Sequence, residues 1–341
     1  MLHAQVIPYR LHFKETAVTS RARMTVKDTY ILRLTDPEAH PGIDGIGEIA
    51  LFRGLSREDT PDFPRALRHV IDNIGSIPLA SIPQSSIRFG IETALLDLRG
   101  GGRRILFDTP FSASLQMIPV NGLVWMGDYP TMRRRLISKI EAGFTTIKIK
   151  IGGIDFEQEL SLLRLLRSDF SERDLTLRLD ANGAFSPADA LSRLDRLAPF
   201  RVHSIEQPIR PGQLDEMARI VSRSPIPIAL DEELIGVTPD AGKALLLDSI
   251  RPHFIILKPS LCGGLAEADS WIRHAVSRGI GWWATSALES NVGLNAIAQW
   301  VSRYAIRTCQ GLGTGALYTD NFPSALRMRG ESLALSPSCI V

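Results

Sequence analysis

The spacing of hydrophobic residues changes near residue 118 and divides the chain into two parts. From there on, short apolar runs alternate with amphipathic stretches in which apolar residues recur at helical spacing, as at Met132, Leu136 and Ile140. Eight runs are expected to be strands: residues 118–123, 145–151, 175–180, 202–206, 226–231, 253–258, 280–285 and 306–311. Strands that alternate with helices predict parallel pairing and closure into a ring. The predicted fold class is α/β, with a (β/α)8-type (modified TIM) barrel over residues 111–319.

The first 110 residues have a different pattern. Segments 12–17, 29–35 and 47–52 are expected to be strands of an antiparallel hairpin or meander, and helical patterns follow at 63–74 and 85–99. We expect residues 1–110 to form an α+β capping domain, joined to the barrel through Gly100-Gly101-Gly102. The C-terminal residues 320–341 are expected to return to that domain.

Composition narrows the possible partners. The chain has 341 residues, 44% of them hydrophobic, and 39 Lys and Arg against 37 Asp and Glu, a formal net charge of +2. This balance predicts neither a nucleic-acid nor a membrane partner. Cys262, Cys309 and Cys339 lie far apart without CxxC spacing, so we expect no disulfide framework and a reducing compartment. No secretion signal or long apolar run is apparent, and the predicted location is cytoplasmic.

Two predicted strands carry charge on one face only. In residues 146–151, Lys148 and Lys150 share one face and three isoleucines the other, while in residues 175–180 Arg178 and Asp180 lie opposite three leucines. The apolar faces should pack under the helices, so the charged faces point into the barrel. Charges enter such an interior only when they are paired or bound to metal. Charged residues at the carboxyl ends of barrel strands therefore predict an active site.

Later strands add further charges at the same level. Glu206, Asp231 and Lys258 end the fourth, fifth and sixth strands, at nearly equal separations of one strand–helix unit after Asp180. Three carboxylates on adjacent strands, with no histidine or cysteine among them, suit an oxygen-ligated cation such as Mg²⁺, and Mn²⁺ is acceptable. Lys258 lies four strands from Lys150 and thus across the ring from it.

Five motifs in this order carry a family resemblance: Lys148-x-Lys150, Asp180-x-Asn182, Glu206-Gln-Pro, Asp231-Glu and Lys258-Pro. Together they resemble the enolase superfamily, and within it the branch that contains muconate-lactonizing enzyme. The resemblance spans essentially the whole chain. It implies a magnesium-dependent enzyme that removes a proton next to a carboxylate and forms an ene-diolate.

The resemblance also implies roles for single residues. Asp180, Glu206 and Asp231 would be metal ligands, Lys150 and Lys258 would be catalytic on the two sides of a small carboxylate substrate, and Lys148 would support the bound carboxylate. Further substrate contacts are expected from other positions that match the family: Arg178, Asn182, Ser20, Ser260, Ser286 and Glu289.

Several reactions remain open within the branch. Softer matches, among them 19–21, 86–92, 121–126 and 285–290, favour the dehydratases that remove water from a cyclohexadiene hydroxy-acid and form the aromatic ring of o-succinylbenzoate on the route to menaquinone. The alternative is racemisation of N-succinylamino acids or epimerisation of dipeptides with the same lysine pair. A catalytically silent barrel that serves as a scaffold is disfavoured, because a scaffold has no need of two lysines and three carboxylates at one level. The oligomeric state is left open.

Overall fold

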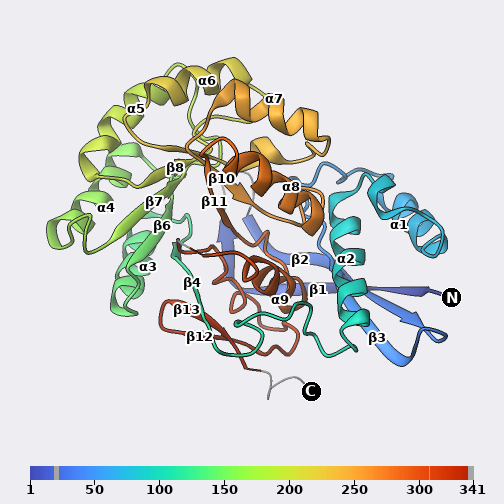
Figure 1. The fold of residues 1–341 in the computed structure, drawn as a ribbon. Helices are drawn as coiled ribbons and strands as arrows, with labels where there is room; N and C mark the ends of the chain where they lie inside the picture. The colour runs from blue at the N-terminus through green and yellow to red at the C-terminus, as the bar shows by residue number, and fades with distance from the viewer. Residues whose placement is uncertain (19–22, 307, 337–341) are drawn as a thin grey trace.

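The computed structural model describes residues 1–18, 23–306 and 308–336. A curved parallel sheet surrounded by helices lies beside a smaller antiparallel sheet (Figure 1). The parallel sheet has the order β11-β10-β9-β8-β7-β6-β5. Its strands are β5 (Gly122–Val124), β6 (Thr146–Lys150), β7 (Thr176–Asp180), β8 (Ser204–Glu206), β9 (Ile228–Leu230), β10 (Phe254–Leu257) and β11 (Gly281–Ala284).

One helix follows each of these strands and covers the outside of the sheet (Figure 1). They are α3 (Tyr129–Glu141), α4 (Phe156–Asp169), α5 (Ala190–Leu197), α6 (Leu214–Arg223), α7 (Asp240–Ile250), α8 (Leu265–Val276) and α9 (Asn291–Val301), with short 3-10 turns η2 (Ala198–Phe200) and η3 (Glu232–Leu234). The predicted α/β barrel class is confirmed.

The prediction of an eighth strand over residues 306–311 is wrong. In the described part of this segment only two residues form parallel bridges, Gln310 to Val120 and Gly311 to Thr285. These bridges join the β4–β5 segment to the end of β11 and so close the ring. The Gln310 side chain accepts a hydrogen bond from the Ala284 amide at 2.7 Å. A side chain therefore provides a link that a longer strand would make with its backbone.

The first predicted barrel strand, 118–123, is divided. Its first residues form β4 (Ile118–Pro119), which pairs with β13 (Ser332–Leu335), and β13 pairs with β12 (Leu326–Arg329). Only β5 enters the parallel sheet, where it pairs with β6. The described C-terminal hairpin thus lies against the start of the barrel, while Tyr318 makes an isolated bridge to Phe13 of the capping domain. The domain boundary near residue 110 stays a prediction.

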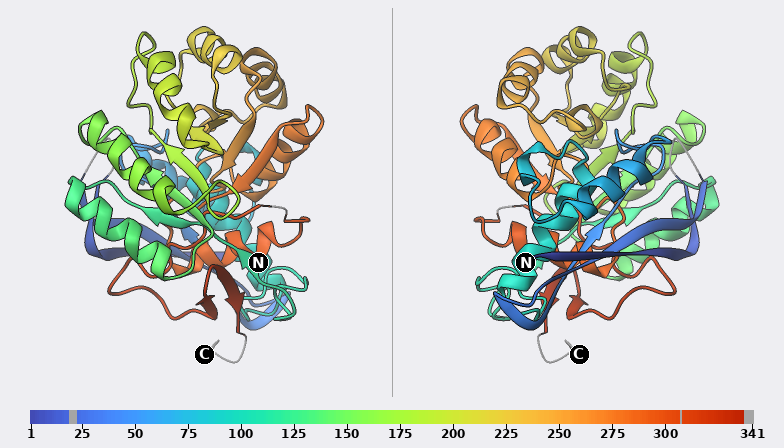
Figure 2. Two further views of the ribbon diagram at one scale, coloured as in Figure 1. Left: turned by 90° about the vertical axis from the view of Figure 1, so that its left-hand side faces the viewer. Right: turned by 90° about the vertical axis from the view of Figure 1, so that its right-hand side faces the viewer.

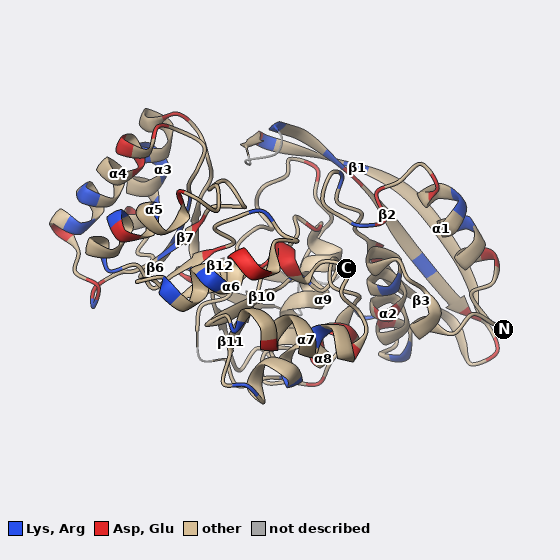
Figure 3. Ribbon diagram, turned by 90° about the horizontal axis from the view of Figure 1, so that it is seen from above, with Lys and Arg blue, Asp and Glu red and all other residues tan. Residues whose placement is uncertain are grey.

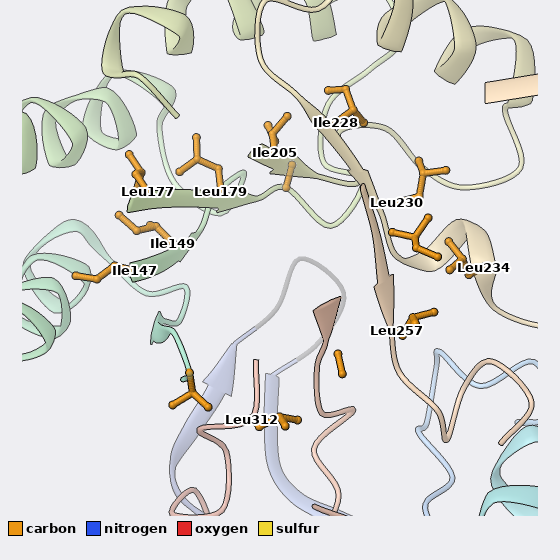
Figure 4. Packing of buried hydrophobic residues seen from close by; sticks show 14 of the residues in the cluster. Ile147, Ile149, Leu177, Leu179, Ile205, Ile228, Leu230, Leu234, Leu257 and Leu312 are labelled. Atoms are coloured by element: carbon orange, nitrogen blue, oxygen red, sulfur yellow. The ribbon is translucent and has the colours of Figure 1, made fainter. Parts of the chain in front are cut away.

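The apolar faces of the strands pack beneath the helices, as expected. Ile147, Ile149, Leu177 and Leu179 are at most 1% exposed and belong to the main hydrophobic core. Figure 4 shows these side chains on the helix side of β6 and β7. Lys148 and Lys150, at alternate positions of β6, consequently face the barrel interior.

The capping domain contains an antiparallel sheet of order β1-β2-β3, formed by β1 (His3–Val18), β2 (Arg23–Asp36) and β3 (His40–Ile49), with α1 (Phe63–Asp72), η1 (Leu79–Ser81) and α2 (Ser85–Arg99). Its helix α2 packs closely on β3, since a Cβ at Gly47 would lie 2.0 Å from the Gly90 carbonyl oxygen. Figure 2 shows β1 and β2 crossing the molecule towards α3, where Arg135 donates to Glu15 at 2.8 Å.

Helix α2 also attaches the cap to the barrel. Glu92 accepts hydrogen bonds from the Leu265 and Ala266 amides at the first turn of α8. Arg88 donates to Glu267 of α8 at 3.0 Å, and Lys243 of α7 pairs with the same carboxylate. Burial raises the pKa of Glu92 to about 7, although the two amides favour its charged form.

Basic and acidic residues are interspersed along the outer helices (Figure 3). Within the described residues, no helix is both long enough and apolar enough to cross a membrane. The cytoplasmic location stays a prediction.

The raised pKa of Glu92 predicts a pH-dependent stability. Between the ordinary carboxyl pKa of 4.5 and about 7, the folded protein keeps a proton that the unfolded chain loses. The stabilisation that this bound proton gives the folded protein is therefore complete below pH 4.5. It is lost as the pH rises through about 7. From pH 5 to 8, the free energy of unfolding should fall by about 3 kcal/mol more for the wild type than for Glu92→Gln. Urea denaturation at each pH measures this, and parallel curves would contradict it.

Candidate active site

Charged side chains gather at the carboxyl ends of β6, β7 and β8. Lys150, Asp180 and Glu206 are register partners on these three neighbouring strands, so they lie at one level of the barrel. Lys148 lies two residues before Lys150 on the same face of β6. All four residues are at least 92% buried. Parallel strands bring these positions together at one end of the barrel, where loops provide access for a substrate.

The lysines and carboxylates form a continuous set of ion pairs. Lys148 Nζ lies 2.9 Å from Asp180 Oδ2 and 2.5 Å from Glu206 Oε2. Lys150 Nζ lies 2.8 Å from Asp180 Oδ2 and donates to Asn182 Oδ1 at 2.6 Å. Buried charges of opposite sign so close together stabilise one another where isolated charges would be costly. Burial raises the pKa of Asp180, but Lys148 and Lys150 outweigh it and hold that pKa well below its usual range.

A second lysine–carboxylate pair lies at the ends of β9 and β10. Lys258, directly after β10, forms an ion pair with Asp231, directly after β9. Burial opposes the charge on Lys258, but Asp231 and Glu206 more than offset it, so the pKa of Lys258 is raised. These two carboxylates therefore favour the charged form of Lys258.

The chemistry and the positions of the carboxylates indicate whether a divalent cation fits the site. Their donors are all oxygens, and Glu206 Oε1 is buried without a hydrogen-bond partner among the described residues. However, across the described ranges no three acidic, histidine or cysteine side chains converge closely enough to hold an ion. Asp180, Glu206 and Asp231 turn oxygens towards lysines instead. The donor chemistry fits Mg²⁺, and a bound ion would require these side chains to rotate away from the lysines.

A cavity of about 540 Å³ opens over these charges. Lys148, Lys150, Asp180, Asn182 and Lys258 lie on its floor. Its walls are largely apolar and come from both domains: Met24, Phe52 and Leu55 from the cap, and Trp125, Leu288 and Leu317 from barrel loops. An apolar cavity with a few converging charged groups is the usual form of a site for a small molecule.

Three of the predicted substrate contacts form a hydrogen-bonded unit. Glu289 is fully buried and accepts from Ser260 Oγ at 2.5 Å and from Ser286 Oγ at 2.7 Å. Of the three, only Ser286 lines the cavity. Glu289, itself bound to Ser260, therefore holds Ser286 in place. Direct contact of Glu289 or Ser260 with a substrate stays a prediction. Ser20 lies outside the described residues.

Arg178 is placed away from the cavity lining, in the barrel interior below Glu206. Its guanidinium donates to the Cys309 carbonyl at 2.8 Å and to Thr308 Oγ1 at 2.5 Å. It stacks on the Trp283 ring, 4.0 Å from the centroid. Burial lowers the pKa of Arg178 to about 10. Arg178 belongs to β7, so these bonds connect β7 to the segment that was expected to form the eighth strand, residues 306–311.

The cap holds the loop that carries Ser286 through a second buried carboxylate. Glu48, in β3, accepts hydrogen bonds from Ser290 N at 3.0 Å, Ser290 Oγ at 2.6 Å and Gly293 N at 3.0 Å. These groups lie at the N-terminus of α9, where negative charge is favoured. Lys27 Nζ is buried nearby without a described hydrogen-bond partner, and burial lowers the pKa of Lys27 against the opposing pull of Glu48 and Glu289.

The sequence revealed only part of the cavity wall: Trp125 lies in the stretch 121–126 that the family resemblance singled out, but the contribution of residues 52–55 was missed. Phe52 was expected in a strand of residues 47–52, but β3 ends at Ile49 and the following residues form a loop over the barrel. Trp125 lies with its ring centroid 5.6 Å from Lys150 Nζ. Arg53 also lines the cavity. For residues 52–55, the available signal was the Phe-Arg-Gly-Leu turn after the third strand of the cap.

The fold and this arrangement of charges define a class of enzymes, the enolase superfamily, and the chain belongs to it. The model of the enolase C-terminal domain-like family matches residues 131–336. Among individual proteins, the chain is 45% identical to the o-succinylbenzoate synthase of Desulfotalea psychrophila, over 96% of this chain and 97% of that protein. It is 37% identical to the N-succinylamino acid racemase of Thermus thermophilus, over 72% of this chain and 62% of the racemase.

Solved structures agree with this placement. The crystal structure of MenC from Desulfotalea psychrophila superimposes with a TM-score of 0.81 at 40% identity and covers 98% of this chain and 99% of its own. The dipeptide epimerase of Enterococcus faecalis, in complex with Mg and the dipeptide L-Leu-L-Tyr, superimposes with a TM-score of 0.81 at 20% identity, over 98% of this chain and 96% of its own, and so shares the fold.

The cap–barrel contact at Glu48 is open to a direct test. In Glu48→Gln, an amide NH2 group replaces one carboxylate oxygen and faces a backbone N–H donor. We expect the free energy of unfolding to fall by about 1.5–3 kcal/mol, as for loss of a charged buried hydrogen bond. Urea denaturation measures the change. Glu38→Gln is the matched control, because Glu38 is 84% exposed and pairs only with the N-terminus among the described residues. Equal stability of the two variants would disprove the role of Glu48.

Proposed function

We propose that the protein is an o-succinylbenzoate synthase, which removes water from a cyclohexadiene hydroxy-acid in menaquinone biosynthesis. The similarity that supports this choice within the superfamily is the 45% identity to an enzyme of that name across nearly the full length of both chains. The cap and the barrel are both included, and in this fold both contribute residues to the cavity walls.

In the proposed mechanism, Lys150 is the base and then the acid. As the free amine, its Nζ takes the proton from the carbon next to the substrate carboxylate, and the C–H electron pair passes into the carboxylate as an ene-diolate. That pair then forms the ring double bond as the C–O bond to the hydroxyl breaks, and Lys150 returns its proton to the departing hydroxide as water. Asn182 Oδ1 accepts a hydrogen bond from Lys150 Nζ at 2.6 Å and would orient it.

Lys258 has a different task in this proposal. Because Asp231 favours its charged form, Lys258 would remain cationic and stabilise negative charge from the other side of the cavity. A divalent cation held by Asp180, Glu206 and Asp231 would supply further stabilisation of the substrate carboxylate. Lys148 would support the same carboxylate from beneath.

Racemisation or epimerisation is the second candidate. The relative that favours it is the Thermus thermophilus racemase, which matches at 37% identity over less of the chain. Such a reaction would require both lysines to exchange protons with the substrate, whereas the proposed dehydration requires exchange only at Lys150.

Substitution of Lys150 tests the proposed base. Lys150→Met should lower kcat for the cyclohexadiene substrate by about 100- to 10,000-fold, the range typical of a lost acid–base group. Loss of the substrate's absorbance measures turnover, and circular dichroism checks the fold. The control is Lys14→Met, since Lys14 is an exposed residue of β1. Near wild-type turnover by folded Lys150→Met would rule Lys150 out. No turnover by the wild type, combined with deuterium exchange into an N-succinylamino acid or a dipeptide, would favour the second candidate.

Calorimetry tests the proposed metal ligands without reference to activity. Mg²⁺ should bind the wild type, and Glu206→Gln or Asp231→Asn should each weaken binding by more than the roughly 10- to 100-fold loss seen for outer partners of metal sites. Glu38→Gln should bind Mg²⁺ as the wild type does. Unchanged affinity in both ligand variants would remove these residues from the metal site.

A further inference from the structure

Among the described residues, the cap brings one cation to the cavity, Arg53, that the proposed mechanism does not use. Arg53 follows β3 in the loop that also contributes Phe52, Gly54 and Leu55 to the cavity lining. The Arg53 side chain is 59% exposed. The lysines on the floor are engaged with carboxylates of the barrel. Arg53 belongs to the part of the cavity wall that the cap provides, whereas these lysines belong to the barrel.

A single carboxylate fixes the position of Arg53. Its Nη1 lies 2.6 Å from Asp59 Oδ1, and Asp59 Oδ2 accepts from the Gly54 amide at 2.8 Å. Asp59 therefore holds both the loop backbone and one nitrogen of the guanidinium. A guanidinium has five N–H donors in a planar fork, and among the described residues the Arg53 side chain donates only to Asp59. The remaining donors are available to a ligand in the cavity.

The charges of the cavity wall indicate which ligand group would fit. Within the described residues, the acids that line the cavity, Asp180 and Glu232, both belong to the barrel. The described residues of the cap contribute a cation and no acid to the lining. Placing a carboxylate in a largely apolar cavity is costly unless a cation pairs with it, and a planar guanidinium binds carboxylate with two parallel hydrogen bonds. A ligand ammonium would be repelled at the same position.

We propose that Arg53 binds the second carboxylate of a dicarboxylate substrate and thereby selects substrates with a succinyl group. This inference rests on the proposed function, because o-succinylbenzoate has one carboxylate on the ring and one at the end of the succinyl chain. With the ring carboxylate at the lysines, the succinyl carboxylate extends towards the cap. N-Succinylamino acids carry the same group, whereas a dipeptide carries an ammonium. The cap wall therefore favours succinyl compounds over dipeptides.

Steady-state kinetics separate this role from a structural one. Arg53→Met should raise KM for the cyclohexadiene substrate by roughly 10- to 100-fold, as expected for a lost charged hydrogen bond, and leave kcat within a few-fold of the wild type. Arg53→Lys, which keeps the charge, should recover part of the loss. The control is Arg57→Met: Arg57 belongs to the same loop but donates to the Gly236 carbonyl and does not line the cavity. An unchanged KM in Arg53→Met, or an equal rise in Arg57→Met, would overturn the proposal.

A pair of ligands tests the same contact independently of turnover. In calorimetry, the wild type should bind o-succinylbenzoate at least about tenfold more tightly than 2-butanoylbenzoate, which lacks the second carboxylate. Arg53→Met should bind the two ligands with similar affinity. A preference that persists in Arg53→Met would overturn the proposal even if the enzyme is an active synthase. If the wild type does not turn over the cyclohexadiene substrate, the proposed function fails, but loss of the preference in Arg53→Met would still support the carboxylate contact.

Discussion

The requirement that every charge inside the barrel has a partner governs this structure. Lys148 and Lys150 are almost completely buried, and they are tolerated there because Asp180 and Glu206 lie opposite them on the neighbouring strands. This pairing depends on register, since a shift by one residue would turn the lysines towards the helices and the isoleucines inward. The hydrophobic layer under the helices and the charged layer at the barrel end are therefore set by the same alternation.

Strand alternation is also the reason that much of the site could be predicted from the sequence. The pattern of β6 and β7 identifies which face of each strand points inward, and the repeat of one strand–helix unit places Glu206, Asp231 and Lys258 at the same end. Neither signal extends to Arg53 or Glu48. Their places depend on how the cap folds over the barrel, which is a matter of contacts between residues distant in sequence.

The errors in the predicted strands have a related cause. Residues 118–123 are apolar enough for one strand, but their first part pairs with β13 and their second part pairs with β6. In the segment 306–311, side chains at Gln310 and Arg178 replace strand pairing. Hydrophobic pattern alone does not reveal where a partner strand is missing. The roles of Ser260 and Glu289 were similarly hidden, because these residues act on Ser286 through hydrogen bonds.

The cap is more than a cover for the cavity. It supplies glutamates to the first turns of two successive barrel helices, Glu92 to α8 and Glu48 to α9, and both helices follow strands whose ends form the site. An isolated barrel would expose these unpaired amides at helix ends. The barrel's shortened eighth segment has a further consequence. Gly311 and Thr285 both border the cavity and are joined there by one bridge, so the ring has a seam beside the substrate. Widening the cavity for a bulkier ligand would break fewer backbone hydrogen bonds at this seam than between β6 and β7, which pair over five residues.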